Sequence, residues 1–387
     1  MKIAIIGAGP AGVMAGIEAL KNGHEIVFFD NASPLTTLLP TGGGRCNLAY
    51  AEFDNKELVN FYPRGGKFLL SVFSQFSTGD TIEFFENIGI KTYIQDDLRI
   101  FPVSNNSKDV QEKMLNQLKS KKVRFIKEKI LKLEHFENKF KVHTKTNAYE
   151  YEKMVFAGGI KNNYDLLKNM GVEVIEPKPA LCAICCEEKN LYSLAGVSFQ
   201  NICATLPNKT QLLGDILITH KSISGPLAYK ISSVCTYNKF PYKISLNFVG
   251  CDYEEFNKVL MEKLNSNSKK DFINIVSEFI PRSFVKYLFE REKIEETLKA
   301  SQVNKEIRTK IANIMTNFEI NIISQKQDGE IVSAGGVNLD FINPKTMEYK
   351  QIKGLYFCGE VLNIDGFTGG FNLQNCWSTG HIVGKSI

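Results

Sequence analysis

The glycine motif Gly7-Ala8-Gly9-Pro10-Ala11-Gly12 constrains the fold of this 387-residue chain more than any other feature. It follows Ile3-Ala4-Ile5-Ile6, a short apolar run that is typical of a buried parallel strand. A helical pattern over Pro10–Lys21 and a second strand over residues 25–30 come next. A G-x-G-x-x-G motif between a strand and a helix predicts a β-α-β unit that binds a dinucleotide.

Each part of this unit has its own expected role. The first glycine permits a tight turn, the second lets the backbone approach a pyrophosphate at the helix N-terminus, and the third permits close packing of helix on strand. Asp30 lies 18 residues beyond Gly12, where an acidic side chain can accept hydrogen bonds from a ribose. It could instead cap a turn, and Asn31 could compete with it. The residues that we expect to contact the dinucleotide are Gly7, Gly9, Pro10, Ala11, Gly12, Asp30 and Asn31.

Two more glycine-rich segments bear on which dinucleotide is bound. The loop Gly42-Gly43-Gly44-Arg45-Cys46-Asn47 offers backbone N–H groups to anionic oxygens, with Arg45 as a phosphate partner. A mobile surface turn is the alternative for this loop. Residues 359–374 lie between a strand and the last helix, whose N-terminus could face the pyrimidine edge of a flavin and stabilise negative charge on its reduced form.

These segments supply most of the remaining expected cofactor contacts. Asn372 and Leu373 are expected at the pyrimidine edge, through side chain or backbone. Glu360 could bind the ribityl chain or a phosphate-bound water, or could cap the last helix. Together with three expected contacts from outside these segments, Ile130, Ala157 and Gly158, the remaining set is Gly43, Gly44, Arg45, Cys46, Asn47, Gly359, Glu360, Asp365, Gly369, Gly370, Phe371, Asn372 and Leu373.

The residue pattern of the chain changes near residue 180 and again near residue 331. Further helices are predicted over residues 67–76, 81–88 and 108–121, and strands over residues 123–126, 140–144 and 154–157. Residues 180–251 and 319–330 are expected to form short strands, and residues 252–318 to be mostly helical. The two ends match in composition, so we predict an α/β dinucleotide-binding domain made of residues 1–179 and 331–387, interrupted by an insertion.

The chain resembles the BaiN-type, aminoacetone-oxidase-like family of FAD-binding oxidoreductases, within the two-dinucleotide-binding-domain flavoproteins. The matching segments follow the family order over nearly the whole chain. They are residues 42–47, 99–102, 214–220, 224–226, 334–337 and 359–374. The resemblance implies a Rossmann-like FAD domain built from both chain ends and interrupted by a small β-barrel that carries a helical subdomain.

The chain also departs from the family pattern in two places. The glycine-rich segment after residues 154–157 is abbreviated to Gly158-Gly159-Ile160-Lys161-Asn162-Asn163, which puts in doubt the contacts usually made by that loop. Ser222 stands where a glycine is common. No second complete G-x-G-x-x-G is present, so NAD(P)H would reduce the flavin by docking transiently, or oxygen would reoxidise it.

The chemistry expected of a flavoprotein directs attention to one or two polar groups, because the flavin itself performs hydride transfer. His220 lies in a segment that matches the family and could protonate a substrate atom as hydride leaves flavin N5. It could equally be a structural hydrogen bonder. The leading hypothesis is a FAD-dependent oxidoreductase that acts on a small or activated unsaturated substrate between the FAD domain and the barrel.

The charge distribution motivates an alternative partner. Residues 108–153 hold 13 basic and 7 acidic side chains in a chain whose net charge is only +5. This stretch is either a solvated face or a patch for an anionic partner. The resemblance extends to reduction of uridine to dihydrouridine in ribosomal RNA, which is the alternative function. A FAD-containing binding protein without turnover is a third.

Composition excludes several other classes. With 43% hydrophobic and 23% charged residues, the chain is neither a disordered tail nor a small disulfide scaffold. The apolar runs are too short for a membrane span or a signal peptide, so a cytoplasmic location is expected. The nine cysteines are expected to be free thiols. In Cys182-Ala183-Ile184-Cys185-Cys186 they are expected to act as small apolar residues rather than metal ligands.

Overall fold

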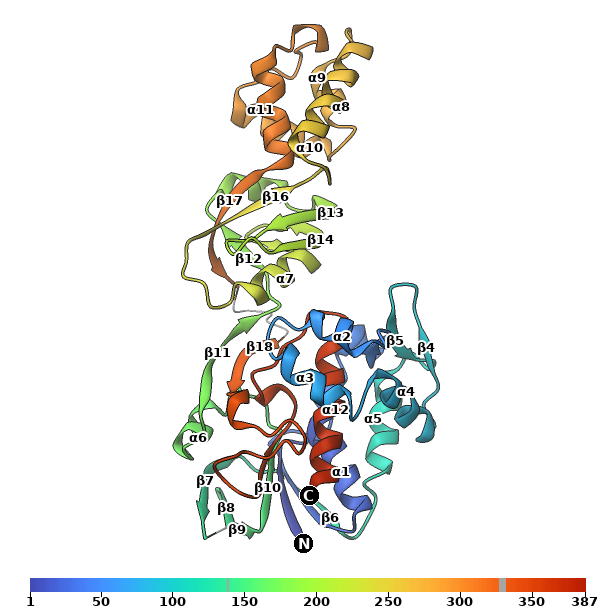
Figure 1. Ribbon diagram of the computed structural model, residues 1–387, viewed down its shortest axis with the longest axis vertical. Helices are drawn as coiled ribbons and strands as arrows, with labels where there is room; N and C mark the ends of the chain where they lie inside the picture. Colours follow the sequence, from blue (N-terminus) through green and yellow to red (C-terminus); the bar gives the residue numbers. More distant parts are fainter. Residues whose placement is uncertain (138, 327–331) are drawn as a thin grey trace. The chain divides into compact units, whose positions relative to one another are not determined.

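The computed structural model describes residues 1–137, 139–326 and 332–387, and the chain divides into two compact units (Figure 1). The first unit consists of Met1–Lys178 and Val332–Ile387, and the second of Pro179–Ile331. The domain boundary predicted between residues 330 and 331 lies outside the described residues.

A five-stranded parallel sheet forms the centre of the first unit. Its strand order is β19-β10-β1-β2-β6, and every neighbouring pair is parallel. The strands are β1 (Lys2–Ile6), β2 (Glu25–Phe29), β6 (Val123–Ile126), β10 (Lys153–Phe156) and β19 (Leu355–Phe357). Because β19 comes from the end of the chain, both chain ends contribute to one sheet. The predicted Rossmann-type fold is confirmed.

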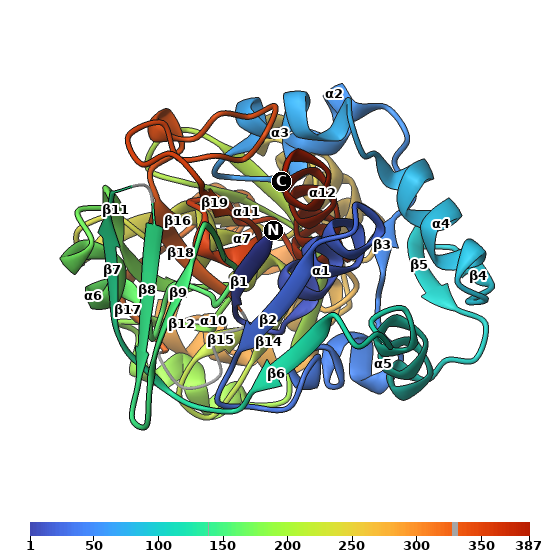
Figure 2. The same cartoon turned by 90° about the horizontal axis from the view of Figure 1, so that it is seen from below.

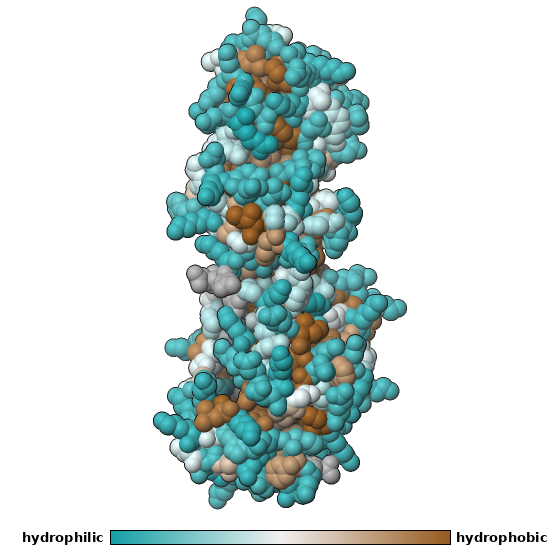
Figure 3. Space-filling view, turned by 90° about the vertical axis from the view of Figure 1, so that its left-hand side faces the viewer, coloured by the Kyte–Doolittle hydropathy of each residue, from teal (hydrophilic) through white to brown (hydrophobic). Residues whose placement is uncertain are grey.

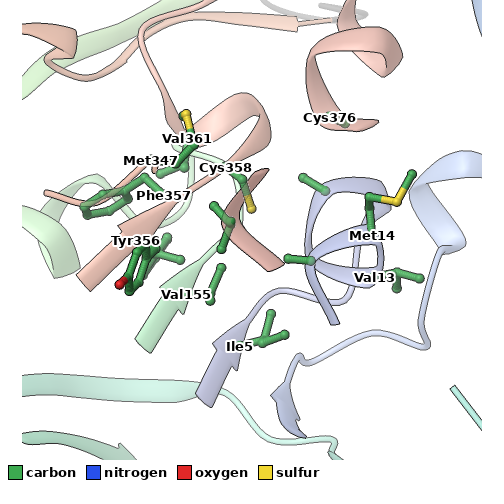
Figure 4. Packing of buried hydrophobic residues seen from close by; sticks show 14 of the residues in the cluster. Ile5, Val13, Met14, Val155, Met347, Tyr356, Phe357, Cys358, Val361 and Cys376 are labelled. Atoms are coloured by element: carbon green, nitrogen blue, oxygen red, sulfur yellow. The ribbon is translucent and has the colours of Figure 1, made fainter. Parts of the chain in front are cut away.

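Helices α1 (Pro10–Lys21) and α12 (Phe371–Ser386) lie side by side in this unit (Figures 1 and 2). A Cβ atom on Gly380 of α12 would lie 2.4 Å from the carbonyl oxygen of Ala11, and one on Gly384 would lie 2.5 Å from that of Ala15. The two helices therefore touch through their backbones. Figure 4 shows Val13 and Met14 of α1 in the same apolar cluster as side chains of the sheet.

The other elements of the first unit surround this core. They are η1 (Thr36–Leu38), η2 (Thr41–Gly44), β3 (Ala49–Tyr50), α2 (Asn55–Leu58), η3 (Val59–Phe61), α3 (Gly66–Phe73), α4 (Thr78–Asn87), β4 (Thr92–Ile94), β5 (Arg99–Pro102), α5 (Ser107–Asn116), β7 (Ile130–Phe136), β8 (Lys139–Thr144), β9 (Ala148–Tyr151), α6 (Tyr164–Asn169), β11 (Val174–Ala180), β18 (Val332–Val337), η6 (Leu339–Phe341) and η7 (Gly359–Val361).

Several predicted bounds differ from the observed ones. The helix expected from residue 81 begins at Thr78, because Ser77 and Asp80 form a capping box that fixes its first turn. The helix expected to reach residue 121 ends at Asn116, where the chain continues into turns. The strand predicted over residues 123–126 is β6 itself.

The second unit contains a closed barrel of order β12-β15-β14-β13-β16-β17, as the resemblance implied. Its strands are β12 (Ile184–Cys186), β13 (Ser198–Thr205), β14 (Gln211–Ile218), β15 (Ile223–Ser224), β16 (Tyr242–Asn247) and β17 (Phe318–Gln325), accompanied by η4 (Lys189–Leu194) and α7 (Pro226–Val234). Between β16 and β17 the chain forms α8 (Tyr253–Ser266), α9 (Phe272–Val276), α10 (Arg282–Glu292), η5 (Ala300–Gln302) and α11 (Lys305–Thr316).

The barrel and these helices share one core. The ring of Phe284 on α10 lies 4.9 Å from that of Phe199 on β13 and 5.7 Å from that of Phe318 on β17, measured between centroids. All three side chains are buried in the same apolar cluster. The second unit is therefore stabilised by its own interior.

The surface is mainly polar on the face drawn in Figure 3, with apolar side chains in separate patches. Among the described residues, no helix combines the length and the apolar character needed to cross a lipid bilayer.

Candidate functional site

Two helices begin at the carboxyl edge of the parallel sheet. Helix α1 follows β1, and α12 follows β19 after a connecting loop. Their N-cap residues are Gly9 and Gly370, and neither helix has a side-chain cap. Free backbone N–H groups and the positive end of the helix dipole make such termini favourable for anionic groups. The site is built around these two termini.

The first glycine turn contains one glycine that the protein's own packing does not require. Gly7 has φ +97°, and a Cβ atom there would lie 2.6 Å from the Cα atom of Gly158. A Cβ atom on Gly12 would lie 2.1 Å from the oxygen of Gly7. On Gly9, with φ −78°, the nearest atom would be Thr37 Oγ1 at 3.6 Å. The open space at Gly9 fits the close approach of a pyrophosphate.

Asp30 stabilises the turn from the next strand end. Its Oδ2 accepts a hydrogen bond of 2.7 Å from the backbone N–H of Ala8, and its Oδ1 accepts one of 2.9 Å from that of Ala32. The capping role considered for Asp30 is therefore present. A carboxylate has about four acceptor positions, so two remain for ribose hydroxyl groups. Asn31 is exposed beside it.

The loop of residues 42–47 is tightly folded. Gly42, Gly43 and Gly44 all have positive φ angles, of 58°, 70° and 85°. The Arg45 guanidinium lies 4.1 Å from the Phe101 ring centroid, and its Nε donates to the carbonyl oxygen of Gly42 at 3.2 Å. Arg45 thus lies back over its own loop in this structure.

The end of this loop contains an unsatisfied buried polar atom. Asn47 is 7% exposed, and its Oδ1 has no hydrogen-bond partner among the described residues. Buried polar atoms are nearly always paired, and this oxygen keeps a hydrogen-bond acceptor position that the described residues do not use. Cys46 is fully buried, and burial raises the pKa of its thiol to about 12. Its thiol is therefore protonated and poorly suited to nucleophilic attack on a flavin.

The abbreviated loop after β10 packs directly under the first glycine turn. Ala157 donates its N–H to the oxygen of Ile6 at 2.7 Å. Asn163 Nδ2 donates to the carbonyl oxygens of Gly158 and Gly159, at 2.6 and 2.9 Å. Ile130 begins β7, half-buried and opposite Thr144.

Glu360, in η7, is a carboxyl group with an unusual environment. Solvent reaches its side chain, yet desolvation by the surrounding protein, followed by the charge of Asp365, raises its pKa to about 7. Next to it, the N–H of Gly359 donates to Thr379 Oγ1 at 2.9 Å, which attaches η7 to α12. At neutral pH Glu360 is therefore partly protonated and able to donate as well as accept a hydrogen bond.

The loop before α12 uses its polar side chains within the protein. Arg64 binds both carboxylate oxygens of the fully buried Asp365 through its Nε and Nη2 atoms. Asn372 accepts from the N–H of Gly366 at 2.8 Å and donates to the oxygen of Gly366 at 2.9 Å. Gly370 has φ +104°, and a Cβ atom there would lie 2.6 Å from the backbone of Ala49.

These contacts leave the backbone N–H groups of residues 371–373 as the donors at the start of α12, because the first turn of a helix has no intrahelical acceptors. Gly369 precedes them in the loop with φ +135°. Arg64 was not expected from the sequence. The only neighbouring sequence feature that could have drawn attention to Arg64 is the Gly65-Gly66 pair that follows it.

His220 lies in the second unit, at the exposed tip of a turn between β14 and β15. The turn is closed by Thr219, whose N–H donates to the oxygen of Ser222 at 2.8 Å and whose hydroxyl lies 2.7 Å from that of Ser222. Ser222, which replaces the glycine common in the family, thus helps to close this turn. His220 forms no side-chain hydrogen bond or ion pair with the described residues.

The cysteines of residues 182–186 lie around β12. Cys182 and Cys186 are buried, and the Cys185 thiol donates to the oxygen of Lys221 at 3.4 Å. Within the described part of the chain, no three His, Cys, Asp or Glu side chains are grouped closely enough to hold a metal ion.

Comparison with known proteins gives the family. The model described as HI0933-like protein Rossmann domain matches residues 1–386. The ribosomal RNA dihydrouridine synthase of Escherichia coli (strain K12) is 26% identical over 392 residues, which cover 97% of this chain and 95% of that protein. The 3-dehydro-bile acid delta(4,6)-reductase of Clostridium scindens is 26% identical over 412 residues, which cover 100% of this chain and 98% of that protein.

A solved structure agrees in fold. The Mycobacterium smegmatis Sdh1 complex in the apo form has a TM-score of 0.51 at 13% identity, covering 100% of this chain and 67% of that one. With the family model matching almost the whole sequence, the chain belongs to the HI0933-like family of FAD-binding, Rossmann-fold oxidoreductases.

Proposed function

We propose that the protein is a FAD-dependent reductase of a small, activated unsaturated substrate. The observation that carries this proposal is the pair of uncapped helix N-termini at one sheet edge, with open space at Gly9. The Clostridium scindens relative, similar over its full length, has a name that describes a reductase. Together these features support a bound dinucleotide used for reduction.

The chain's own residues would bind and orient the cofactor. The turn formed by Gly7, Gly9, Pro10, Ala11 and Gly12 would bind the pyrophosphate, and Asp30 the adenosine ribose. The N–H groups of residues 371–373 would donate to the pyrimidine edge. FAD, when bound, supplies hydride transfer at N5.

Two side chains would manage protons. Glu360, with a pKa near 7, would form a hydrogen bond with the ribityl chain in either protonation state. His220 would deliver a proton to the substrate, which its exposed and unpaired position permits. Its replacement by Gln is expected to lower turnover while FAD content stays the same. Unchanged turnover would assign His220 a structural role.

The test of the proposal is a spectrum of the purified protein and its anaerobic titration with NADPH and NADH. We expect flavin absorbance that one of the two nucleotides bleaches. A colourless protein that cannot be reconstituted with FAD would refute the proposal. A stable, yellow protein that no reductant or substrate turns over would instead indicate a FAD-containing binding protein.

A second candidate function is reduction of uridine in ribosomal RNA. It is favoured by the Escherichia coli relative's name and by the basic stretch of residues 108–153. Most of its basic side chains are exposed in the first unit: Lys108, Lys119, Lys121, Lys122, Arg124, Lys127, Lys129, Lys132, Lys139 and Lys145. Dihydrouridine mapping of ribosomal RNA from a strain without the protein tests this alternative, and an unchanged profile would exclude it.

A further inference from the structure

Residues 61–65, here called the clamp, hold the loop that leads into α12. Arg64 and Asp365 pair through their side chains and also through a backbone β-bridge. Tyr62 donates its hydroxyl hydrogen to the carbonyl oxygen of Phe371, the first residue of α12, at 2.7 Å. The N–H of Phe367 donates to the oxygen of Phe61 at 2.9 Å. The clamp thus contacts the loop at its beginning, middle and end.

These contacts are buried. Asp365 is fully buried, Tyr62 is 5% exposed, and the Arg64 side chain is 15% exposed. Burial raises the pKa of Tyr62 well above its usual range, so the hydroxyl keeps the proton that it donates. A Cβ atom on Gly65 would lie 2.6 Å from Ile364 Cγ1, so the two segments are in close contact at this glycine.

A buried ion pair defines geometry more than it adds stability. Desolvation of the two charges offsets most of their attraction, but removal of one partner leaves an uncompensated buried charge. The two parallel hydrogen bonds of a guanidinium with a carboxylate fix the orientation of both groups. Arg64 therefore specifies where Asp365, and the loop that follows it, must lie.

We propose that Arg64 is a positioning residue that acts through Asp365 to fix the N-terminus of α12 and thereby tunes the reduction potential of bound FAD. The inference rests on the proposed function, because it needs FAD at this helix. The N–H groups of residues 371–373 would favour negative charge on the reduced cofactor only if they are held at the correct place. Asp365 influences the cofactor through the loop rather than by touching it, because its side chain is fully buried inside the protein, paired with Arg64.

The test compares Arg64→Gln, Asp365→Asn, the double variant and Arg64→Lys. FAD affinity is measured by titrating the apoprotein, the midpoint potential by equilibration with dyes, and apoprotein stability by thermal unfolding. We expect each single change to Gln or Asn to weaken FAD binding about tenfold, or 1.4 kcal/mol. The preference for the reduced over the oxidised cofactor should also fall about tenfold, a potential about 30 mV more negative.

The pattern across variants separates positioning from stability alone. The double variant should lose less than the sum of the single losses, because the two residues form one unit. Arg64→Lys keeps the positive charge but loses the planar guanidinium that forms two parallel hydrogen bonds. It should therefore retain more of the wild-type FAD affinity and potential than Arg64→Gln does. The matched control is Arg291→Gln, which breaks a more exposed Arg–Glu pair with Glu292 in the second unit and should change neither quantity.

Two results would overturn the inference, and they are distinguishable. If wild-type protein binds no FAD, the proposed function fails, and the inference fails with it. If wild-type protein binds FAD but Arg64→Gln and Arg64→Lys keep its affinity and potential, the clamp is only structural, whatever their unfolding temperatures. Arg64→Lys keeps the test decisive should Arg64→Gln fail to fold.

Discussion

At the scale of single residues, the glycines of one motif divide into two kinds. Gly7 and Gly12 are required by the protein itself, because a side chain at either would collide with backbone atoms. Gly9 has no such constraint. The motif therefore combines two glycines that packing requires with one that it does not, and the two kinds can be separated by experiment.

The first residue-scale prediction uses Gly9→Ala and Gly12→Ala as a matched pair. Gly9→Ala should change the free energy of unfolding of the apoprotein by less than about 1 kcal/mol, the cost of a poorer N-cap residue, while it weakens FAD binding about tenfold. Gly12→Ala should destabilise the apoprotein by about 1–3 kcal/mol through overpacking. Denaturant unfolding and FAD titration measure both. Unchanged FAD affinity in Gly9→Ala would contradict the role of the open space.

The second residue-scale prediction concerns Glu360. Its pKa is raised from 4.5 to about 7, so the folded protein binds its proton more tightly than the unfolded chain does. The resulting stability is present at low pH and is lost as the pH rises from about 4.5 through 7. The stability of the apoprotein relative to Glu360→Gln should therefore fall over this window in denaturant titrations at successive pH values. Parallel pH profiles of the two proteins would show that the pKa is not raised.

At the scale of elements, the contact of α1 with α12 determines where both helix N-termini lie. The contact depends on two glycines of α12, which let the helix backbones touch. The sequence predicted both helices, α1 from its helical spacing and α12 from its place after the last strand. Only the packed structure shows which faces of α1 and α12 are in contact. It also shows that the glycines of α12 make this contact possible.

The element-scale prediction compares Gly380→Ala with Gly79→Ala, both inside helices. Gly380→Ala places a Cβ atom 2.4 Å from the oxygen of Ala11, so we expect a loss of about 1–3 kcal/mol in the free energy of unfolding. In Gly79→Ala the nearest atom would be 3.6 Å away, and the higher helix propensity of Ala should stabilise α4 by up to about 1 kcal/mol. Thermal unfolding of the two apoproteins measures both. Equal stabilities would contradict the close helix contact.

At the scale of the whole molecule, the chain consists of two units with separate cores. The first unit is built from both chain ends, and the second is one continuous segment whose barrel and helices share an interior. A continuous segment with its own core is expected to fold independently.

The corresponding prediction is that residues 179–331, expressed alone, form a folded protein without FAD. Circular dichroism should show mixed helix and strand content and a single cooperative thermal transition. The fragment should not bind FAD, because all the glycine segments lie in the first unit. A fragment without a cooperative transition would show that the second unit depends on the first for its folding.

The amino-acid sequence by itself determined the fold class and the location of the three glycine segments. These features depend on periodicity and on motifs within a few neighbouring residues, which a single chain reveals directly. It also implied the inserted barrel through family resemblance. The expected cofactor contacts were chosen in the same way and stay predictions.

Only the tertiary structure decided which polar side chains are used inside the protein. Arg64 and Asp365 are 301 residues apart in the sequence, and Trp377 donates to the oxygen of Leu48 across 329 residues. No local sequence pattern predicts such a pair, because the packing of the sheet, helices and loops determines which distant residues come into contact. For the same reason the sequence pointed to Asp365 but not to Arg64, the residue that holds it.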